Sequence, residues 1–292
     1  MITWLVQNVG FSTTNLDLTE ETLNRLDIPY QLFGISKLIN YVINLENILK
    51  NPDEQFIIRG GTSLLSLLSK IDNLKEINPN LSEEQLIYSQ QYISNLKNGI
   101  FYDEKNFDQS FYGSLNLPLL NNDCQNLPIK DFLNQSFDKD VFIKPSRDQK
   151  AFNAGILEKG YTIKDFIFSQ IHEAFYIDEI AIIAPLKEIY SEYRFFVVNQ
   201  DVITGSQYRL NNQLFVSEYI PDNILQAAKE YAKLYQPHDI FTMDLADTKE
   251  GIKIVEYNCW NASGLYKTNI PKIFNAVQEF KEYQINTKKF KI

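Results

Sequence analysis

The sequence is poor in the residues and runs that mark several common classes of protein. It has 292 residues but only two cysteines, Cys124 and Cys259, and two histidines. Two distant cysteines cannot make a disulfide framework, and a Cys/His zinc site would need all four scattered residues. No apolar run approaches the roughly 20 residues of a membrane span, and the N-terminal segment lacks the features of a signal peptide. We therefore expect a cytoplasmic protein without a membrane segment.

Basic charge and the common nucleotide and catalytic signatures are also missing. The formal net charge of −9 disfavours a nucleic-acid coat, because binding phosphates requires a basic surface. The patterns GxxxxGK[ST], GxGxxG, HExxH and GxSxG are all absent. The chain does contain 44% hydrophobic residues, with 20 Phe and 17 Tyr, which is ample material for a core.

The N-terminal third alternates strand-like and helix-like segments. Residues 1–7, 29–34 and 55–60 have the character of short buried strands, and helix-like segments follow the first and the third. This alternation predicts a small α/β lobe with parallel strands. A capping-box pattern from Ser82 to Gln85 predicts a helix that ends near Asn98. Residues 101–130 have no clear periodicity, and we place a domain boundary there, between residues 115 and 116.

The rest of the chain mixes strands and helices, which predicts an α+β architecture. We expect a helix at 222–236 with Asp222 as its N-cap, and a closing helix with Pro271 in its first position. The segment FTMDLADTKEGIKIVEYN predicts a hairpin that turns at Thr248–Gly251.

The hairpin carries a candidate metal site. Glu256 and Asn258 are two residues apart and point to the same face of their strand. Asp244 lies about opposite Glu256 if the turn centres near Glu250, whereas a one-residue change of register would turn it to the other face. Two carboxylates and an amide oxygen suit Mg²⁺, especially when phosphates complete its shell. The alternative is an ordinary strand with polar residues facing solvent.

Two basic segments are candidates for anion binding. Lys144 follows an apolar strand and precedes a polar turn with Arg147 and Lys150; it either contacts a phosphate or is simply solvated. Arg194 and Arg209 lie on two strands that we expect to pair. They either hold carboxylate or phosphate oxygens or form structural ion pairs with Glu192 or Glu218.

A third candidate is the turn from Arg59 to Thr62. This RGGT segment joins a predicted strand to a predicted helix, where free backbone N–H groups favour anions. It is equally compatible with a tight connection that has no ligand.

The order of these segments resembles the ATP-grasp superfamily. FIKPSRDQKAF, SEYRFFVVNQDVITGSQYR and FTMDLADTKEGIKIVEYNCWNASGLY are similar to the bacterial and phage clade that is named for two arginines and a lysine. The resemblance covers about residues 101–270. It implies an ATP-grasp fold, with a first lobe at 116–186 and a second at 187–292, that grips ATP. Residues 1–115 resemble the family's pre-ATP-grasp lobe.

The resemblance also implies a reaction and its residues. The expected enzyme is a Mg-ATP-dependent ligase that forms a C–N bond from a small-molecule, peptide or protein carboxylate and an amine, through an acyl phosphate, with release of ADP. The cofactors would be ATP and Mg²⁺. Lys144 and Lys150 would contact ATP, Arg194 and Arg209 would steady the reacting group, and Asp244, Glu256 and Asn258 would hold the metal.

The sequence departs from the family pattern at the hinge. The hinge should lie at residues 182–186, where Ile183, Ala184 and Leu186 would contact the nucleotide. We expect an acidic residue before Pro185 to bind the ribose, but Ala184 stands there. The loop SRDQKAFNAG also has a single glycine. These departures motivate a second hypothesis, a nucleotide-binding or regulatory module that keeps the fold without catalysis. A kinase that stops at phosphorylation is a third.

Overall fold

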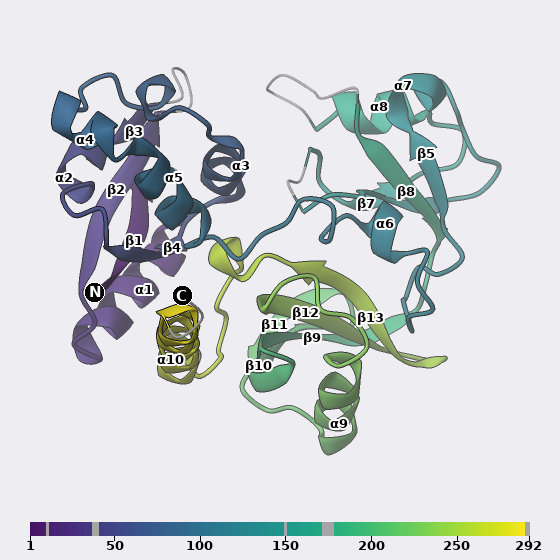
Figure 1. Cartoon of the computed structure of the whole chain (residues 1–292). Coiled ribbons are helices and arrows are strands. Elements are labelled where there is room, and N and C mark those ends of the chain that lie inside the picture. The colour runs from purple at the N-terminus through teal and green to yellow at the C-terminus, as the bar shows by residue number, and fades with distance from the viewer. Residues whose placement is uncertain (10–11, 37–40, 149–150, 171–177, 290–292) are drawn as a thin grey trace. The chain divides into compact units, whose positions relative to one another are not determined.

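The computed structural model describes residues 1–9, 12–36, 41–148, 151–170 and 178–289. The chain divides into two compact units (Figure 1). Unit 1 combines residues 1–102 with the C-terminal segment 259–292, and unit 2 comprises residues 103–258. Unit 1 is therefore built from two separate stretches of the sequence, and its last helix comes from the C-terminal stretch.

Unit 1 has the elements β1 (Ile2–Val9), α1 (Thr13–Arg25), β2 (Tyr30–Ser36), β3 (Tyr41–Ile43), α2 (Leu45–Ile48), β4 (Gln55–Arg59), α3 (Thr62–Lys70), η1 (Leu74–Glu76), α4 (Glu83–Ile87), α5 (Ser89–Lys97), η2 (Trp260–Ala262) and α10 (Ile270–Lys289). Within the described residues its strands form one sheet in the order β3-β2-β1-β4. β1 runs parallel to β2 and β4, which confirms the parallel α/β lobe expected from the sequence. The predicted capping box is also present, at Ser82 and Gln85.

Successive side chains of β1 point to opposite faces of this sheet, and both faces are apolar. Helices therefore cover both faces. Leu5 packs with α3 and α5 in one core that also contains Phe56. On the other face, Trp4 stacks against Phe274 of α10 at a ring distance of 4.6 Å and donates a hydrogen bond to Gln278. This packing explains why α10 belongs to unit 1. The predicted domains placed residues 187–292 together in one lobe; that division stays a prediction, and the compact units follow different boundaries.

The turn after β4 is a tight connection that uses its own polar groups. The Gly61 N–H donates to Gln7 Oε1 at 2.8 Å, and the Gly60 N–H donates to the carbonyl of Asn261. A Cβ at Gly60 would come within 2.7 Å of Gln7 Oε1, so a side chain does not fit here. Arg59 is fully buried and donates to the carbonyls of Trp260 and Ser263. These contacts favour the ligand-free alternative for the RGGT segment.

Unit 2 has the elements α6 (Gln109–Tyr112), β5 (Gln125–Pro128), α7 (Ile129–Phe132), β6 (Val141–Pro145), β7 (Gly155–Leu157), α8 (Ile163–Phe168), β8 (Ile180–Pro185), β9 (Ile189–Val198), β10 (Asp201–Leu210), β11 (Gln213–Ser217), α9 (Asp222–Tyr231), β12 (Ile240–Thr248) and β13 (Gly251–Asn258). In the described part of the chain these strands form two antiparallel sheets. We call β5-β8-β6-β7 the first sheet and β11-β10-β9-β12-β13 the second sheet.

Each sheet of unit 2 has its own apolar layer. In the first sheet, Ile143 and Ile183 pack with Ile163 and Ile167 of α8. In the second sheet, α9 packs across β10, β12 and β13 and buries Ile224 and its neighbours. The opposite face of the second sheet is left for polar and charged side chains. The hairpin turn at Thr248–Gly251 is confirmed, because these two residues close the β12–β13 ladder.

Three details of two predicted helices are wrong. α9 begins at Asp222 but its N-cap is Pro221, so Asp222 is the first helical residue, and the helix ends at Tyr231 instead of 236. α10 begins at Ile270, which makes Pro271 its second residue. In both cases the element exists where expected, and only its end is shifted by the local backbone.

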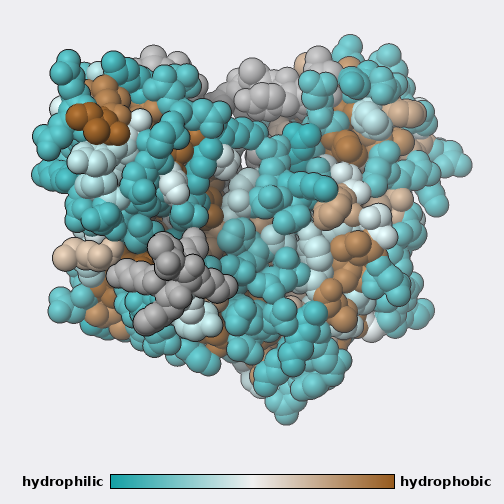
Figure 2. Space-filling view, in the orientation of Figure 1, coloured by the Kyte–Doolittle hydropathy of each residue, from teal (hydrophilic) through white to brown (hydrophobic). Residues whose placement is uncertain are grey.

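Figure 2 shows a face on which hydrophilic residues predominate and hydrophobic residues form small separate groups. Among the described residues, no helix combines the length and the apolar content that crossing a bilayer requires.

Candidate active site

Three adjacent strands of the second sheet place charged residues in one row. Arg194 of β9 is the cross-strand neighbour of Asp244 of β12, and Asp244 is the neighbour of Glu256 of β13. Direct neighbours in an antiparallel sheet point to the same face. The predicted register of Asp244 and Glu256 is therefore confirmed.

A β-bulge at Val255 produces this register. From the turn to Leu245 the hairpin is regular, with Leu245 opposite Ile254. A regular continuation would place Asp244 opposite Val255 and turn Glu256 to the other face. Because Val255 is the extra residue of a bulge, Glu256 and Asn258 return to the face of Asp244. The turn centres between Lys249 and Glu250, which by itself would pair Asp244 with Val255. The expected pairing of Asp244 with Glu256 is therefore correct because of the bulge and not because of the position of the turn.

Arg194 and Asp244 form a buried bidentate ion pair. Arg194 Nε donates to Asp244 Oδ1 at 2.8 Å, and Nη2 donates to Oδ2 at 2.7 Å. Their side chains are 11% and 2% exposed. The Arg194 guanidinium also lies 5.8 Å from the centre of the Tyr208 ring. This planar, two-bonded geometry fixes both groups and is stronger than a surface ion pair.

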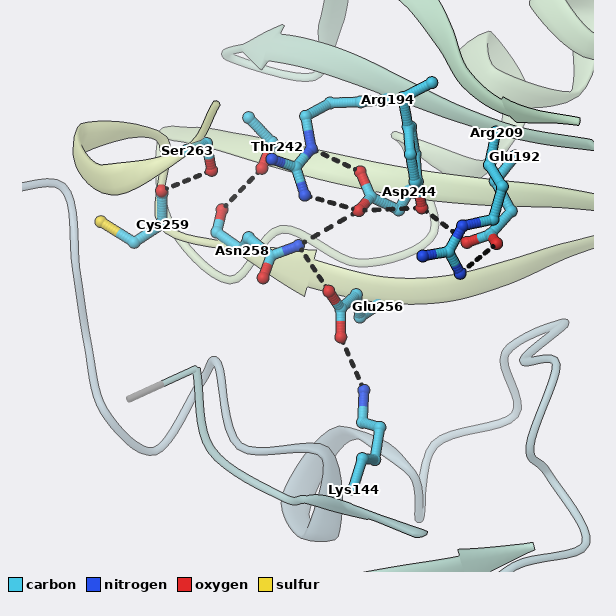
Figure 3. Close-up of polar contacts among 11 residues, drawn as sticks. Lys144, Glu192, Arg194, Arg209, Thr242, Asp244, Glu256, Asn258, Cys259 and Ser263 are labelled. Carbon is cyan, nitrogen blue, oxygen red and sulfur yellow. Dashed lines mark hydrogen bonds and ion pairs between the residues drawn. The ribbon is translucent and has the colours of Figure 1, made fainter. Parts of the chain in front are cut away.

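Lys144 links the first sheet to the second. It lies near the end of β6, and its ammonium contacts Glu256 Oε2 at 2.7 Å, as Figure 3 shows. The Asn258 amide nitrogen lies 3.1 Å from Glu256 Oε1 and 3.5 Å from Asp244 Oδ2, between the two carboxylates. Burial raises the pKa of Glu256, but the Lys144 ammonium, the charge of Arg194 and the Asn258 amide together outweigh this effect and lower the pKa to about 2. Glu256 is therefore ionised near neutral pH.

Arg209 reaches the same face through a second bulge. Arg194 pairs with Ser206 of β10, and after the irregularity at Tyr208 it is Arg209 that pairs with Glu192. Arg209 donates to Glu192 Oε1 at 3.1 Å, and the Tyr208 hydroxyl donates to Glu192 Oε2 at 2.7 Å. Burial raises the pKa of Glu192 above its ordinary value despite these two donors.

Glu192 and Tyr208 are site residues that the sequence analysis did not select. Glu192 was named only as a possible partner for the arginines, and it is indeed the partner of Arg209. Its position two residues before Arg194 on a strand was a usable signal, because such residues share a face. Tyr208 had no comparable signal, because the alternation of side chains along a strand does not indicate where a bulge occurs.

A cavity of about 280 Å³ opens beside the Lys144–Glu256 contact. Its lining combines the region of α6, the end of β6, the segment that follows it and the end of β13, namely Phe107, Tyr112, Lys144, Pro145, Ser146, Arg147, Asp148, Phe152, Asn153, Ala154, Glu256, Tyr257 and Asn258. Aromatic walls with a few charged groups are typical of small-molecule sites. Arg147 is held at 3.3 Å from Glu104 and 3.6 Å from Asp108.

The residues present fit a hard divalent cation. Within the described residues no group of three or more His, Cys, Asp or Glu side chains could hold a metal ion. A metal here therefore needs Asn258 as a ligand besides Asp244 and Glu256. The Asn258 amide reaches both carboxylates, and a half-turn of this amide presents its oxygen in place of its nitrogen. Two carboxylates and one amide oxygen are hard donors of the kind that Mg²⁺ prefers.

The hinge residues come from β8, which pairs with β6, and from the residue just after its end. Ile183 and Ala184 are buried in β8, Leu186 is 46% exposed, and none of the three lines the cavity. β5 pairs with β8 only as far as Ile183, so Ala184 and the residues after it have no β5 neighbour. Lys150 lies outside the described residues. The structure thus brings together Lys144, Arg194, Arg209, Asp244, Glu256 and Asn258.

The alternatives for the arginines and the hairpin can now be compared. Arg209 has the ion pair with Glu192 that was the structural alternative, whereas Arg194 pairs with Asp244, a candidate metal ligand. Asp244 and Asn258 are 1% and 6% exposed, so β12 and β13 do not present an ordinary solvated face here.

Comparisons with known proteins agree with this architecture. No curated protein matches the chain. Among solved structures, D-alanine–D-alanine ligase from Bacillus anthracis is 12% identical, with a TM-score of 0.58 and full coverage of both chains. D-cycloserine synthetase DcsG is 8% identical, with a TM-score of 0.56 and coverage of 96% of this chain and 99% of that one. At such identities the likeness concerns the fold.

The family match is more specific. The matching family is described as an ATP-grasp domain, the second family of the clade that is named for two arginines and a lysine. It matches residues 125–276, which is more than half of the chain. The match includes both sheets of unit 2 and every residue of the charged row. The chain therefore belongs to the ATP-grasp domain family, in the clade that takes its name from two arginines and a lysine.

Proposed function

We propose that this protein is an ATP-dependent ligase that joins a carboxylate to an amine or a related nucleophile. The observation that carries the proposal is the contact between Lys144 and Glu256 beside the cavity. It brings a strand-end lysine next to a row of two carboxylates, an amide and two arginines. Two solved structures with this fold are named as ligase and synthetase, and one ligase structure is a complex with ATP.

The reaction would have two steps. A substrate carboxylate oxygen attacks the γ-phosphorus of ATP, the bond to the bridging oxygen breaks, and an acyl phosphate and ADP result. An amine then attacks the acyl carbon, phosphate leaves with the electron pair, and the amine loses a proton. Phosphoryl transfer of this type depends mainly on positioning and on neutralising charge spread over the phosphoryl oxygens.

The chain's own residues would supply these effects as follows. Lys144, at the end of β6, would contact the phosphates of the nucleotide as a point charge. Asp244, Glu256 and Asn258 would hold Mg²⁺, which neutralises charge on the phosphate oxygens. Arg194 and Arg209, on one face with these ligands, would orient the acyl phosphate through paired N–H donors. Lys150 would add a contact from the segment that follows β6.

The first test is thermal unfolding with and without Mg-ATP. A ligand that binds only the folded state stabilises it by about 2.7 kcal/mol at a hundredfold excess over its Kd. We expect a clear rise in the unfolding temperature of the wild type and its loss in Glu256→Gln, which changes the charge but keeps the shape. Glu250→Gln, in the exposed turn of the same hairpin, is the matched control. No rise in the wild type at millimolar Mg-ATP would count against the proposal.

The second test addresses the intermediate. Hydroxylamine converts an acyl phosphate to a stable hydroxamate, so a panel of carboxylic acids with ATP and hydroxylamine should give a hydroxamate and equimolar ADP for the true substrate. Formation of AMP instead of ADP would contradict the acyl-phosphate route.

The second candidate function is nucleotide binding without ligation. The observation that favours it is Ala184, which is buried in β8 where the family pattern led us to expect an acidic residue. Its signature would be a Mg-ATP shift in unfolding temperature together with no ADP or hydroxamate from any acid in the panel.

A further inference from the structure

The proposed ligase site contains its own counter-ions, and these carry a further inference about how its ligands bind. The Lys144 ammonium lies 2.7 Å from Glu256 Oε2, and the Arg194 guanidinium donates hydrogen bonds to both carboxylate oxygens of Asp244. Asn258 also directs its amide nitrogen toward the two carboxylates. Both carboxylates proposed to hold the metal are thus engaged with donors from the chain itself.

The charges of this cluster sum to zero, because two cations face two carboxylates. A divalent cation that reaches Asp244 and Glu256 has to displace or share with Lys144 and Arg194, which leaves positive charge in excess. A nucleotide alone meets the opposite difficulty. Its phosphates can take Lys144 only by leaving Glu256 ionised and without its cationic partner, although the Glu256 side chain is only 31% exposed and so only partly hydrated. Each ligand alone therefore breaks an ion pair.

We infer that Lys144 and Arg194 are exchangeable counter-ions that couple metal binding to nucleotide binding at this site. When both ligands are present, the metal takes the carboxylates and the phosphates take the released cations, so every charged side chain of the cluster keeps a partner of opposite charge. Coupling of this kind is reciprocal, because each ligand raises the affinity for the other by the same factor. This inference rests on the proposed function and adds to it the order and interdependence of ligand binding.

Direct metal–phosphate contact would also couple the two ligands, so the decisive prediction concerns the metal alone. Lys144→Met removes the competitor for Glu256 and leaves that carboxylate available. Arg147→Met removes a positive charge that lines the same cavity but pairs with Glu104 and Asp108 instead. A general effect of charge would appear in both variants, whereas competition for Glu256 would appear in Lys144→Met alone.

The experiment titrates Mn²⁺ into the full-length protein and measures free Mn²⁺ by electron paramagnetic resonance. We expect Lys144→Met to raise the affinity for Mn²⁺ alone by about tenfold, within the usual range of coupling factors, and Arg147→Met to leave it within about twofold of wild type. A non-hydrolysable ATP analogue should raise the Mn²⁺ affinity of wild type by a larger factor than that of Lys144→Met. Unchanged or weaker Mn²⁺ binding in Lys144→Met, or an equal gain in both variants, would overturn the inference.

A second measurement uses the wild type and does not depend on the folding of a variant. Mass spectrometry after brief labelling with an amine-reactive ester reports the reactivity of Lys144. Mg²⁺ alone should increase this labelling by releasing the lysine from Glu256, and Mg²⁺ with the analogue should decrease it. Labelling that does not respond to Mg²⁺ would contradict the exchange. If the analogue has no effect on either readout, the proposed function fails, while the response to metal alone still decides the inference.

Discussion

The two sheets of unit 2 each hold a glutamate whose carboxylate is stabilised in a different way. Glu179, which immediately precedes β8 of the first sheet, is 3% exposed and accepts hydrogen bonds from the Ser146 hydroxyl at 3.1 Å and the Ile180 N–H at 3.2 Å. Both donors are neutral. Glu256 of the second sheet is instead bound by the ammonium of Lys144.

This difference in partners reverses the direction of the pKa shift. Burial raises the pKa of Glu179 above its ordinary value of 4.5, and its neutral donors and the charge of Arg147 do not compensate. Burial also raises the pKa of Glu256, but Lys144, Arg194 and Asn258 together lower it to about 2. Burial alone therefore does not identify a carboxylate that is ready to bind a metal. A cationic partner beside a cavity is the more informative sign, because it keeps the charge and can be exchanged for another cation.

The largest effect should come from breaking the charge pair at the centre of the second sheet. Asp244→Ala leaves the buried guanidinium of Arg194 without its bidentate partner, and losing one member of a buried ion pair costs about 3–5 kcal/mol. We expect that loss in the free energy of unfolding measured by urea denaturation. Asp247→Ala, three residues further along β12 and only half-buried, is the control and should cost far less. Equal losses in the two variants would mean that the pair adds nothing specific.

A smaller effect is expected when a carboxylate is placed in the first sheet without a partner. Ala184 is 1% exposed and lies opposite Phe142, so Ala184→Glu buries an acid against an aromatic ring. A buried polar group without a hydrogen bond costs about 1–3 kcal/mol. We expect this destabilisation and no gain in Mg-ATP affinity, although the resemblance to the family led us to expect an acid there. Leu186→Glu, at an exposed position, is the matched control; tighter Mg-ATP binding by Ala184→Glu would show that the side chain reaches the nucleotide.

In the second sheet, breaking the ion pair of Arg209 with Glu192 should destabilise the protein less than Asp244→Ala does, because this pair is more exposed to solvent. The Arg209 side chain is 48% exposed, and its partner Glu192 keeps the hydrogen bond from Tyr208 in its absence. Arg209→Met should therefore cost only about 1 kcal/mol, near the upper limit for exposed pairs. Urea denaturation of Arg209→Met and Asp244→Ala under the same conditions compares the two losses in the free energy of unfolding. A loss as large as that of Asp244→Ala would indicate that Glu192 depends on Arg209 to remain buried.

Much of this architecture could be predicted from local patterns. The strands β1, β2 and β4 and the helices after β1 and β4 follow from alternation and turn residues, and the structure confirms that these strands are parallel. β3 and α2 were not predicted, and the single helix expected after Ser82 is two helices, α4 and α5. The pairing of Asp244 with Glu256 was also expected. Such features depend on neighbours in sequence, which is why a single sequence contains them.

The rest depends on long-range packing and on bulges. Nothing near residue 270 indicates that α10 packs on Trp4, at the opposite end of the chain. The bulges at Val255 and Tyr208 determine which side chains face the site, yet no residue type is required at either position. The pairing of Arg194 with Asp244 comes from the β9–β12 ladder, whereas Glu192 was already a possible partner of Arg209. The roles of Lys144, Lys150, the arginines and the hinge residues stay predictions.

The smallest effect should come from neutralising the carboxylate of the first sheet. Because the folded-state pKa of Glu179 lies above 4.5, protonation favours the folded state, and this contribution is lost as pH rises through the folded pKa. Glu179→Gln removes the buried charge and keeps an oxygen for Ser146. We expect its unfolding temperature to exceed that of wild type by about 1–3 °C at pH 7 and to match it below pH 4.5. Glu256→Gln, without ligands, should show the opposite sign at pH 7, because the charge of Glu256 is stabilising above pH 4.5. A lower unfolding temperature for Glu179→Gln at pH 7 would mean that Arg147, not burial, controls this carboxylate, and the contrast between the two sheets would disappear.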